Sequence, residues 1–551
     1  MSKSGFRLVA LAIVMVFSGT FACRTASLMA QDIRGETAVP RPPMGWSSWN
    51  SFSNTVDSKV IVDQARAMIS TGMHKAGYEY INIDEGWWLG HRDEQGNIVV
   101  DPKSWPALAP GERAGDMSNI VGYLHGMGLK VGIYTDAGRD GCGTFSPDLG
   151  PGYANEGSEG HYEQDFLQFA KWGFDYVKVD WCGGSKENLD PAIQYAEIAR
   201  AIAQAEAITG HQLYFSICNW GKQSPWTWAP NVGGVAADIW RTSSDIVDPI
   251  VANTPNAGRK ASFKKVLSNF DQGIHPETQH TGFFNDPDIM VLGMNGLTDA
   301  ENRAHMSLWA ISGAPLLVGA DLTKLSDPTL ATLTNPAVLA IDQDALGLQA
   351  VKVAERGTGL TVWSKPLAAG GKRAVLLLNS TDSSAPISVY WRDLGLLGSA
   401  SARVTDAWSG KELGAFDDFY SVTVPTGDAV LLRVQGTEGK FSYYKAASSV
   451  EQAARTQIAR NSPIIFPAVV SRMHLALIQI TYTNPDKTPR FAELRVNGHA
   501  ATRISFPPTG SGKGKGSIWI QAILHPDGAS NVLAFSAPCN LGPDIESISV
   551  E

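Results

Sequence analysis

Between residues 41 and 325, short apolar segments alternate with longer amphipathic stretches, and the apolar segments end in polar or charged residues. This alternation predicts eight strands with helices between them, which is the pattern of a (β/α)8 TIM barrel in an α/β protein. A doubly wound sheet is the alternative, but no Gly-rich phosphate turn follows the first strand. The strands are predicted at residues 44–49, 80–84, 131–136, 176–181, 213–218, 239–245, 289–293 and 316–319.

The segment between the first two strands is predicted to be an amphipathic helix. Asp57 or Ser58 would cap its N-terminus, because short polar side chains accept hydrogen bonds from the first free N–H groups of a helix. Apolar residues recur there at helical spacing. They are Ile61, Ala65, Met68 and Ile69, which we expect on one buried face.

After about residue 345 the pattern changes to short strands separated by Gly, Ser and Asp turns, which predicts an antiparallel β-sandwich. A Gly-containing linker at 435–440 leads to a third segment that again contains strands, with a flexible Gly/Lys loop at 511–516. Strands are predicted at 360–363, 374–378, 387–391 and 429–434, and then at 475–482, 491–496, 518–524 and 532–535. The predicted domains are a catalytic barrel at 31–340, a β-sandwich at 341–437 and a second β-sandwich at 438–551, after a signal peptide at 1–30.

The first thirty residues resemble a secretory signal peptide. Lys3 and Arg7 precede an apolar run at 8–17, which small residues follow as far as Ala30. The chain is therefore expected to be exported, to the periplasm or the cell exterior, where disulfides are permitted. A lipid anchor at Cys23 is an alternative, although Thr20 and Phe21 match such a site poorly.

Composition narrows the classes of partner. The chain has 551 residues, too many for one core, and 44% of them are hydrophobic while 18% are charged, as in globular proteins. The net charge of -9 argues against a nucleic-acid partner. No protein partner can be inferred, and neither a metal ion nor an organic cofactor is implied for the chemistry.

Two predicted strands end in a carboxylate. Asp180 lies near the end of the segment 176–182 (YVKVDWC), and Asp245 ends 239–245. Burying a carboxylate is costly, so each needs a reason. A single such residue is explained well enough as a strand-end cap or salt-bridge partner. Two of them at the C-terminal ends of separate barrel strands are what a retaining glycosidase requires.

Seven motifs in order extend this interpretation. Residues 40–435 resemble glycoside hydrolase family 27, the α-galactosidase (melibiase) family. The matching stretches are 43–50 (PMGWSSWN), 77–84 (GYEYINID), 132–138 (GIYTDAG), 178–180 (KVD), 218–221 (CNWG), 240–245 (WRTSSD) and 285–288 (NDPD). The resemblance implies a retaining exo-glycosidase for terminal α-D-galactosyl residues, with Asp180 as nucleophile and Asp245 as acid/base. We expect Asp180 to stay ionised with help from Lys178.

The resemblance also implies a substrate pocket. Trp49 would stack on the sugar, Asp84 and Lys178 would bind ring hydroxyls, and Arg241 would donate to hydroxyls near C2 and C3. Barrel-rim packing is the alternative for the aromatic residues. The full predicted substrate-binding set is Trp49, Asp84, Glu85, Tyr134, Lys178, Cys182, Asn219, Trp220 and Arg241.

Other residues of the motifs are assigned structural roles. The resemblance implies a disulfide between Cys142 and Cys182 that ties the loop after the third strand to the nucleophile strand. Cys218 has no evident partner and is interpreted as a small buried residue. Asp286 and Asp288 are interpreted as holding the turn at the seventh strand.

Two departures from the family pattern bear on the substrate. Glu85 stands where α-galactosidases usually have Asp, and its longer side chain could crowd the C6 group of galactose. A β-L-arabinopyranosidase, whose sugar lacks C6, is therefore the alternative, unless the carboxylate turns aside. Asn219 stands where animal relatives have Glu, and its amide can still bind a free 2-hydroxyl.

A non-catalytic carbohydrate-binding protein on a degenerate barrel is a third, remote interpretation. The expected partner is thus a carbohydrate that contains galactose or arabinopyranose.

The third segment resembles a family 35 type carbohydrate-binding module, chiefly at 482–484, 494–498 and 540–548. Such modules commonly carry a calcium-binding Glu in their first strand, and the stretch 441–447 has no acidic residue. A purely structural sandwich is therefore an equal alternative for this segment.

Overall fold

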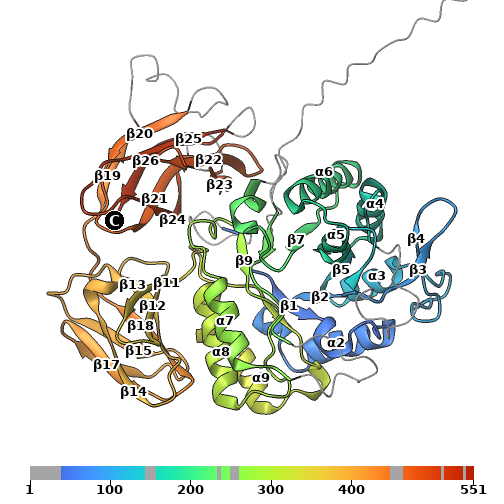
Figure 1. Ribbon diagram of the computed structural model, residues 1–551, viewed down its shortest axis with the longest axis horizontal. Helices are drawn as coiled ribbons and strands as arrows, with labels where there is room; N and C mark the ends of the chain where they lie inside the picture. Colours follow the sequence, from blue (N-terminus) through green and yellow to red (C-terminus); the bar gives the residue numbers. More distant parts are fainter. Residues whose placement is uncertain are drawn as a thin grey trace, which may run out of the picture.

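The computed structural model describes residues 39–142, 157–231, 237–247, 260–446, 463–499, 501–510, 514–537 and 542–551. A barrel and two β-sandwiches lie side by side, and the sandwiches form the left half of the view in Figure 1. This confirms the predicted fold class. The signal peptide, Cys23 and residues 511–513 of the Gly/Lys loop lie outside the described residues.

Eight parallel strands form the barrel, in the order β10-β1-β2-β5-β6-β7-β8-β9. A parallel bridge between Met290, just after β9, and Val318 of β10 brings the two edges together. The barrel strands are β1 (Met44–Ser47), β2 (Tyr80–Asn82), β5 (Lys130–Asp136), β6 (Tyr176–Asp180), β7 (Tyr214–Cys218), β8 (Ile239–Arg241), β9 (Phe284–Asp286) and β10 (Leu316–Val318).

Helices surround these strands, and a hairpin of β3 (Trp88–Arg92) and β4 (Ile98–Val100) projects after β2 (Figure 1). The helices are α1 (Trp49–Phe52), α2 (Ser58–Ser70), α3 (Ser118–Gly126), α4 (Tyr162–Trp172), α5 (Cys182–Lys186), α6 (Pro191–Thr209), α7 (Phe263–Gln272), α8 (Asp299–Ser312), α9 (Asp327–Leu333) and α10 (Pro336–Asp342). Within the described residues, no helix combines the length and the apolar character that a membrane span requires.

The first long helix, α2, begins as predicted. The Asp57 carboxylate accepts the Val60 N–H at 2.7 Å, so Asp57 is the N-cap. Ile61, Ala65 and Met68 are buried, as expected. Ile69 is 38% exposed, so its assignment to the buried face was wrong. It lies at the border of the buried stripe, about 40° around the helix axis from Ala65 and about 100° from Met68.

The seventh barrel strand lies earlier than predicted. It is β9, at Phe284–Asp286, and the predicted segment 289–293 contributes only the isolated bridge of Met290. Ile289, Met290, Val291 and Leu292 are all buried. These four residues are apolar because they are buried, although they do not form a strand. The strand itself, β9, gave a weaker signal because it ends in the polar residues Asn285 and Asp286.

The second domain is an antiparallel β-sandwich, and its four predicted strands are confirmed. It packs against the barrel through α8, where the Trp408 indole donates to the Ser307 hydroxyl at 3.1 Å. A six-stranded sheet has the order β11-β12-β13-β18-β15-β16, and β14 pairs with β17. The strands are β11 (Val351–Glu355), β12 (Leu360–Pro366), β13 (Lys372–Asn379), β14 (Ala385–Tyr390), β15 (Ala402–Asp406), β16 (Glu412–Phe416), β17 (Phe419–Val424) and β18 (Asp428–Gln435).

The third domain consists of two four-stranded antiparallel sheets, in the orders β19-β26-β21-β24 and β20-β25-β22-β23. Its core also includes Val39, from the segment that leads into β1. The Ser505 N–H donates to the Thr281 hydroxyl of the barrel at 3.1 Å. The strands are β19 (Ser442–Lys445), β20 (Ile464–Val469), β21 (Leu475–Thr483), β22 (Arg490–Val496), β23 (Thr502–Phe506), β24 (Gly516–Ile523), β25 (Asn531–Ser536) and β26 (Asp544–Val550).

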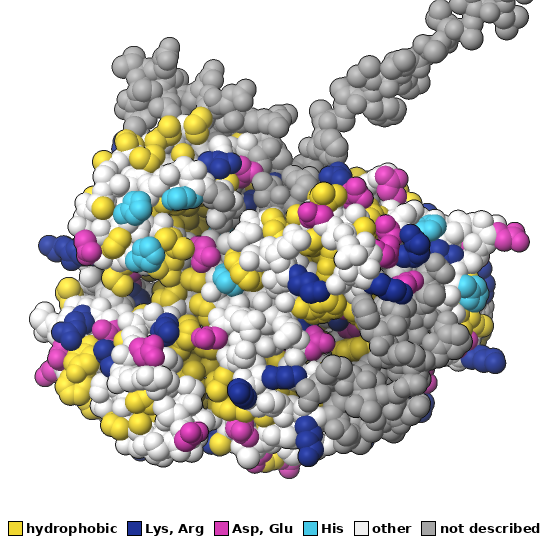
Figure 2. Space-filling model, in the orientation of Figure 1, with side chains coloured by type: hydrophobic (Ala, Val, Ile, Leu, Met, Phe, Trp, Pro, Cys, Tyr) yellow, Lys and Arg dark blue, Asp and Glu magenta, His cyan; other side chains and the backbone are white. Residues whose placement is uncertain are grey.

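Charges are mixed on the face shown in Figure 2, where Lys and Arg side chains are interspersed with Asp and Glu. Over the described residues of this face, no extended basic surface is visible that would attract a phosphate backbone.

Candidate active site

Polar residues from several motifs meet at the C-terminal ends of the barrel strands. In the parallel register, Asp136 of β5 lies beside Asp180 of β6, which lies beside Cys218 of β7. Arg241 ends β8 and lies beside Asp286 of β9. Active sites of this barrel type form at this edge, because the loops that follow the strands converge there.

Asp180 is buried and held in a fixed direction. Its side chain accepts the Trp181 N–H at 2.9 Å, and its other carboxylate oxygen lies 3.6 Å from Lys178 Nζ. Lys178 precedes it by two positions on β6, so both side chains leave the strand on the same side. Burial raises the pKa of Asp180, and the positive charge of Lys178 opposes this rise. Repulsion from Asp84 and Asp245 raises the pKa further.

Lys178 joins two acidic residues. Its Nζ lies 2.9 Å from Asp84 Oδ2, closer than to Asp180. The Asp84 carboxylate also accepts the Ser47 hydroxyl at 3.4 Å and the Glu85 N–H at 3.0 Å. Lys178 Nζ lies 5.2 Å from the centre of the Tyr134 ring. The structure therefore brings together Asp84, Tyr134, Lys178 and Asp180, as predicted.

Trp49 and Glu85 flank this group. Trp49 is half-buried at the start of α1, directly after β1. Glu85 is completely buried, and a Cβ atom on Gly141 would lie 2.5 Å from Glu85 Oε1. The Glu85 carboxylate is thus directed at the backbone of the loop that follows β5.

Asp136 was not predicted as a site residue, although it organises this side of the site. Its carboxylate accepts the backbone N–H groups of Gly138, Cys182, Gly183 and Gly184, at 2.7, 2.6, 3.0 and 3.4 Å. Three of these groups belong to the first turn of α5, which follows β6. The signal available in the sequence was a strand-end Asp beside a second strand that ends in Asp-Trp-Cys-Gly-Gly.

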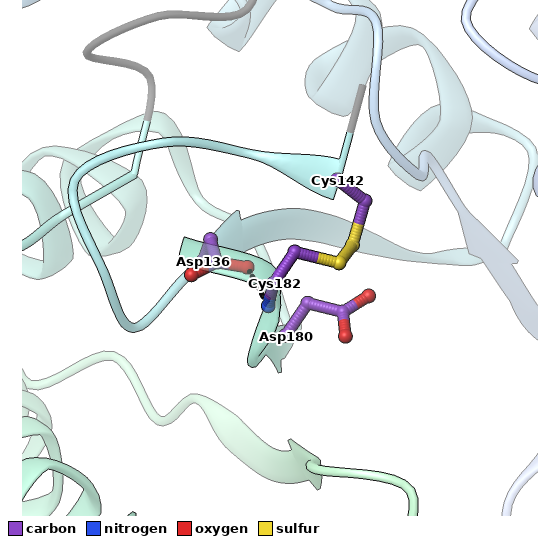
Figure 3. Close-up of side chains that lie close together, drawn as sticks. All are labelled: Asp136, Cys142, Asp180 and Cys182. Carbon is purple, nitrogen blue, oxygen red and sulfur yellow. Dashed lines mark hydrogen bonds between the residues drawn. A yellow bond between two sulfur atoms is a disulfide. The ribbon is translucent and has the colours of Figure 1, made fainter. Parts of the chain in front are cut away.

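The predicted disulfide between Cys142 and Cys182 is confirmed (Figure 3). Figure 3 shows Asp136, the disulfide and Asp180 next to one another at the ends of β5 and β6. The loop after β5 approaches the first turn of α5 closely. A Cβ atom on Gly138 would lie only 2.2 Å from the backbone nitrogen of Gly184. Glycine is therefore required at this crossing.

The second carboxylate, Asp245, does not end a strand as predicted, because β8 ends at Arg241 and Asp245 follows in the loop, where its environment is more open. Its side chain is 49% exposed, and Oδ1 lies 2.8 Å from Arg241 Nη2. Arg241 is buried, and its Nη1 lies 3.0 Å from Asp288 Oδ1 and 3.6 Å from Cys218 Sγ. Cys218 is a free buried thiol, as interpreted from the sequence.

The loop after β7 places Asn219 and Trp220 beside the loop after β8. A Cβ atom on Gly221 would lie 2.2 Å from the Thr242 carbonyl oxygen, which shows how closely the two loops pack. Asn219 is completely buried and donates to the Lys222 carbonyl at 2.7 Å. Lys222 Nζ lies 4.9 Å from the centre of the Trp220 ring. The contact of Asn219 with a sugar hydroxyl stays a prediction.

Comparison with known protein families identifies three regions of the chain. Residues 41–344 match the family model described as alpha galactosidase A, and residues 357–434 match the alpha galactosidase C-terminal beta sandwich domain. Residues 466–550 match a model described as alpha-galactosidase, CBM13 domain. The likeness of this third region to a family 35 module therefore stays a prediction.

Individual relatives agree with these matches. Alpha-galactosidase A of Cellvibrio japonicus is 37% identical over 426 residues, which are 76% of this chain and 97% of that protein. A probable alpha-galactosidase of Dictyostelium discoideum is 36% identical over 72% of this chain and 93% of that protein. Among solved structures, alpha-galactosidase I from Mortierella vinacea has a TM-score of 0.62 at 28% identity and covers 74% of this chain and 100% of that chain.

Proposed function

Because the chain belongs to glycoside hydrolase family 27, the α-galactosidase family, we propose that it is a retaining exo-glycosidase that removes terminal α-D-galactosyl residues. The observation that carries this proposal is a pair of carboxylates in unlike surroundings at the C-terminal edge of the barrel, one at the end of β6 and one in the loop after β8. Asp180 is buried beside Lys178, whereas Asp245 is half exposed beside Arg241. The Cys142–Cys182 disulfide supports an exported location, because disulfides persist in oxidising compartments.

In the first step, the ionised Asp180 attacks the anomeric carbon while Asp245 gives its proton to the glycosidic oxygen. The bond from C1 to that oxygen breaks, and a bond from C1 to the Asp180 carboxylate forms. In the second step, Asp245 takes a proton from water. The water oxygen then attacks C1 and releases Asp180, so the product keeps the configuration of the substrate.

The surroundings of the two carboxylates match these roles. Asp180 must point in one direction, and the Trp181 N–H and Lys178 fix it. Asp245 must exchange its proton with water in each cycle, which its exposure allows. When glycosylation removes the negative charge of Asp180, repulsion between the two groups ends. Asp245 can then lose its proton more easily and act as the base.

The remaining predicted residues would form the sugar subsite. Asp84 and Lys178, already joined, offer an acceptor and a donor to ring hydroxyls, and Arg241 offers donors on the opposite side. Trp49 offers an apolar ring face on which the sugar can stack. Tyr134, Cys182, Asn219 and Trp220 would complete the walls.

The direction of Glu85 favours a galactoside over a β-L-arabinopyranoside. A carboxylate that filled the space of C6 would face the pocket, whereas Glu85 is completely buried and directed at Gly141. We therefore propose that Glu85 lies in the wall behind the pocket and leaves room for the hydroxymethyl group of galactose.

The test is kcat/KM on an aryl α-D-galactopyranoside and an aryl β-L-arabinopyranoside, measured side by side. We expect a preference for the galactoside, and we expect Glu85→Asp to change it little. A preference for the arabinoside that reverses in Glu85→Asp would support the alternative specificity. A change of one methylene in a pocket shifts such a ratio by about 10- to 200-fold. Hydrolysis of neither substrate would contradict the proposed function.

We also propose three folded domains. The predicted boundary at 340 falls inside α10, so we place it in the segment between α10 and β11. The boundary at 437 lies between β18 and β19, where the chain passes into the third domain.

A further inference from the structure

Asp288 has an unusual backbone and a buried carboxylate. It lies two residues after β9 and is 4% exposed. Its φ angle is 125°, a region that residues other than glycine rarely adopt. Such a conformation persists only where the surroundings hold it firmly, and it is common at functional sites. The turn role that the sequence suggested does not require an acidic side chain in this conformation.

The Asp288 carboxylate contacts two groups that adjoin Asp245, namely the Arg241 guanidinium and the backbone of Ile246. Oδ1 lies 3.0 Å from Arg241 Nη1, and Arg241 Nη2 lies 2.8 Å from Asp245. Oδ2 accepts the backbone N–H of Ile246 at 2.7 Å, and Ile246 directly follows Asp245. Oδ1 also accepts the Ile289 N–H at 2.7 Å, which fixes the carboxylate in its own turn.

From this geometry we propose that Asp288 is the positioning residue of the acid/base Asp245, a role that rests on the proposed function. Through Ile246 it fixes the backbone that carries Asp245. Through Arg241 it sets the direction from which the guanidinium contacts the Asp245 carboxylate. Both contacts act on the residue that must protonate the leaving group, and neither involves Asp180.

Asp288 also shares the charge of Arg241. The groups that face this guanidinium are Asp245, Asp288, the Cys218 thiol and, further away, Asp286. Within the described residues, its ion-pair partners are Asp245 and Asp288 alone. Without the Asp288 carboxylate, Asp245 would be the remaining carboxylate partner, and the guanidinium would no longer be held in the direction from which it contacts Asp245.

The leaving group of the substrate separates this role from a structural one. A 4-nitrophenol leaving group needs little protonation, whereas an alcohol needs full protonation by the general acid. The test is therefore to compare kcat/KM of wild type and of Asp288→Asn on 4-nitrophenyl and on methyl α-D-galactopyranoside. We expect a loss of about 100-fold or more on the methyl substrate and less than about 10-fold on the aryl one. An equal loss on both substrates, or no loss, would overturn the proposal.

Two further variants complete the experiment. Asp175→Asn is the control, because Asp175 precedes β6 at the opposite end of the barrel and an amide there still accepts the Val131 N–H at 2.8 Å, so both substrates should be hydrolysed as by wild type. In an Asp245→Ala background, Asp288→Asn should cause no further loss on the aryl substrate, and an additional loss would contradict action through Asp245.

The outcome is interpretable even if a variant is unstable. If Asp288→Asn does not fold, Asp288→Glu keeps the charge but displaces the carboxylate, and the same selective loss is expected. A uniform loss in that variant would overturn the proposal. If wild type hydrolyses neither galactoside, the proposed function is wrong. If wild type is active and Asp288→Asn is unaffected, the role of Asp288 is wrong while the proposed function stands.

Discussion

The two sides of the candidate active site are built differently around one basic residue each. On one side Lys178 lies between Asp84 and Asp180, and both carboxylates are buried. On the other side Arg241 lies between Asp288 and Asp245, and Asp245 is half exposed. The first side is also tied by the Cys142–Cys182 disulfide, whereas ion pairs and backbone hydrogen bonds hold the second.

This difference matches the different tasks of a nucleophile and an acid/base. A nucleophile works best when its direction is fixed before the reaction, because no reorganisation is then needed at the transition state. An acid/base must gain and lose a proton in every cycle, which requires access to water. Burial and the nearby disulfide suit the role of Asp180. A partly exposed carboxylate whose backbone and basic partner are held by Asp288 suits the role of Asp245.

Removal of the proposed nucleophile, Asp180, should have the largest effect. We expect Asp180→Ala to lower kcat on aryl α-galactosides by at least about 10⁴-fold, because the covalent step is lost. Azide should restore turnover by filling the vacated space, and it should yield a β-galactosyl azide because it attacks once from the opposite face. Kinetics and the anomeric configuration of the product measure both effects.

Asp175 provides the control for this variant, since it lies at the other end of the same strand. It accepts the Val131 N–H at 2.8 Å and contacts His125. Asp175→Ala should therefore lower the melting temperature while kcat stays close to that of wild type. A similar loss of kcat in both variants would assign Asp180 a structural role.

Removal of the cation on the nucleophile side should have the next largest effect. Lys178→Met leaves Asp84 and Asp180 buried without it, which we expect to cost about 3–5 kcal/mol of stability. Burial already raises the pKa of Asp180 and Lys178 opposes this rise, so the pKa should rise further in the variant. Because Asp180 reacts as the ionised group, the acidic limb of the kcat/KM profile should move to higher pH.

Lys186 is the matched control for Lys178, because it also pairs with an Asp but at the surface. Its Nζ lies 2.7 Å from Asp140 Oδ2, and its side chain is half exposed. Lys186→Met should change stability by about 1 kcal/mol or less and leave the pH profile in place. A profile that does not move in Lys178→Met would show that Lys178 does not act on Asp180.

Removal of the disulfide should have the smallest effect on catalysis. The bond closes a loop of 40 residues, so replacing both cysteines with serine should lower stability by about 4 kcal/mol. Asp136 still holds the first turn of α5 through backbone hydrogen bonds, so kcat should fall only slightly. Thermal unfolding and aryl galactoside kinetics test this, with dithiothreitol-treated wild type as the comparison. A large loss of kcat at an unchanged melting temperature would contradict it.

Most of the barrel could be predicted because its strands are apolar runs that end in polar residues. The exception, β9, has three residues and two of them are polar, so the apolar segment that follows it gave the stronger signal. The cap at Asp57 followed from local chemistry. The exposure of Ile69 could not be predicted in this way. Residues at the border of an apolar stripe recur at the same helical spacing as residues inside it, so the spacing does not show where the buried face ends.

Within the site, the residues to which we assign chemistry were easier to select from the sequence than the residues that hold them in place. Asp180, Asp245 and Lys178 stand in recognisable motifs, whereas Asp136 acts on the N–H groups of a helix that begins after a different strand. Asp288 likewise acts through Arg241 and the Ile246 backbone. Contacts of a side chain with the backbone of a distant segment place no requirement on the residue types of that segment. The sequence pattern therefore does not reveal them.

The packing of Val39 links the beginning of the chain to its end. Val39 lies just before β1, yet its apolar neighbours belong to the last domain, which also contacts the barrel at Thr281. During synthesis this valine leaves the ribosome long before the strands that will cover it. Contacts between such distant segments form late and slowly. Val39 therefore stays uncovered until translation is almost complete, and in that interval it would be open to chaperones or to misassembly.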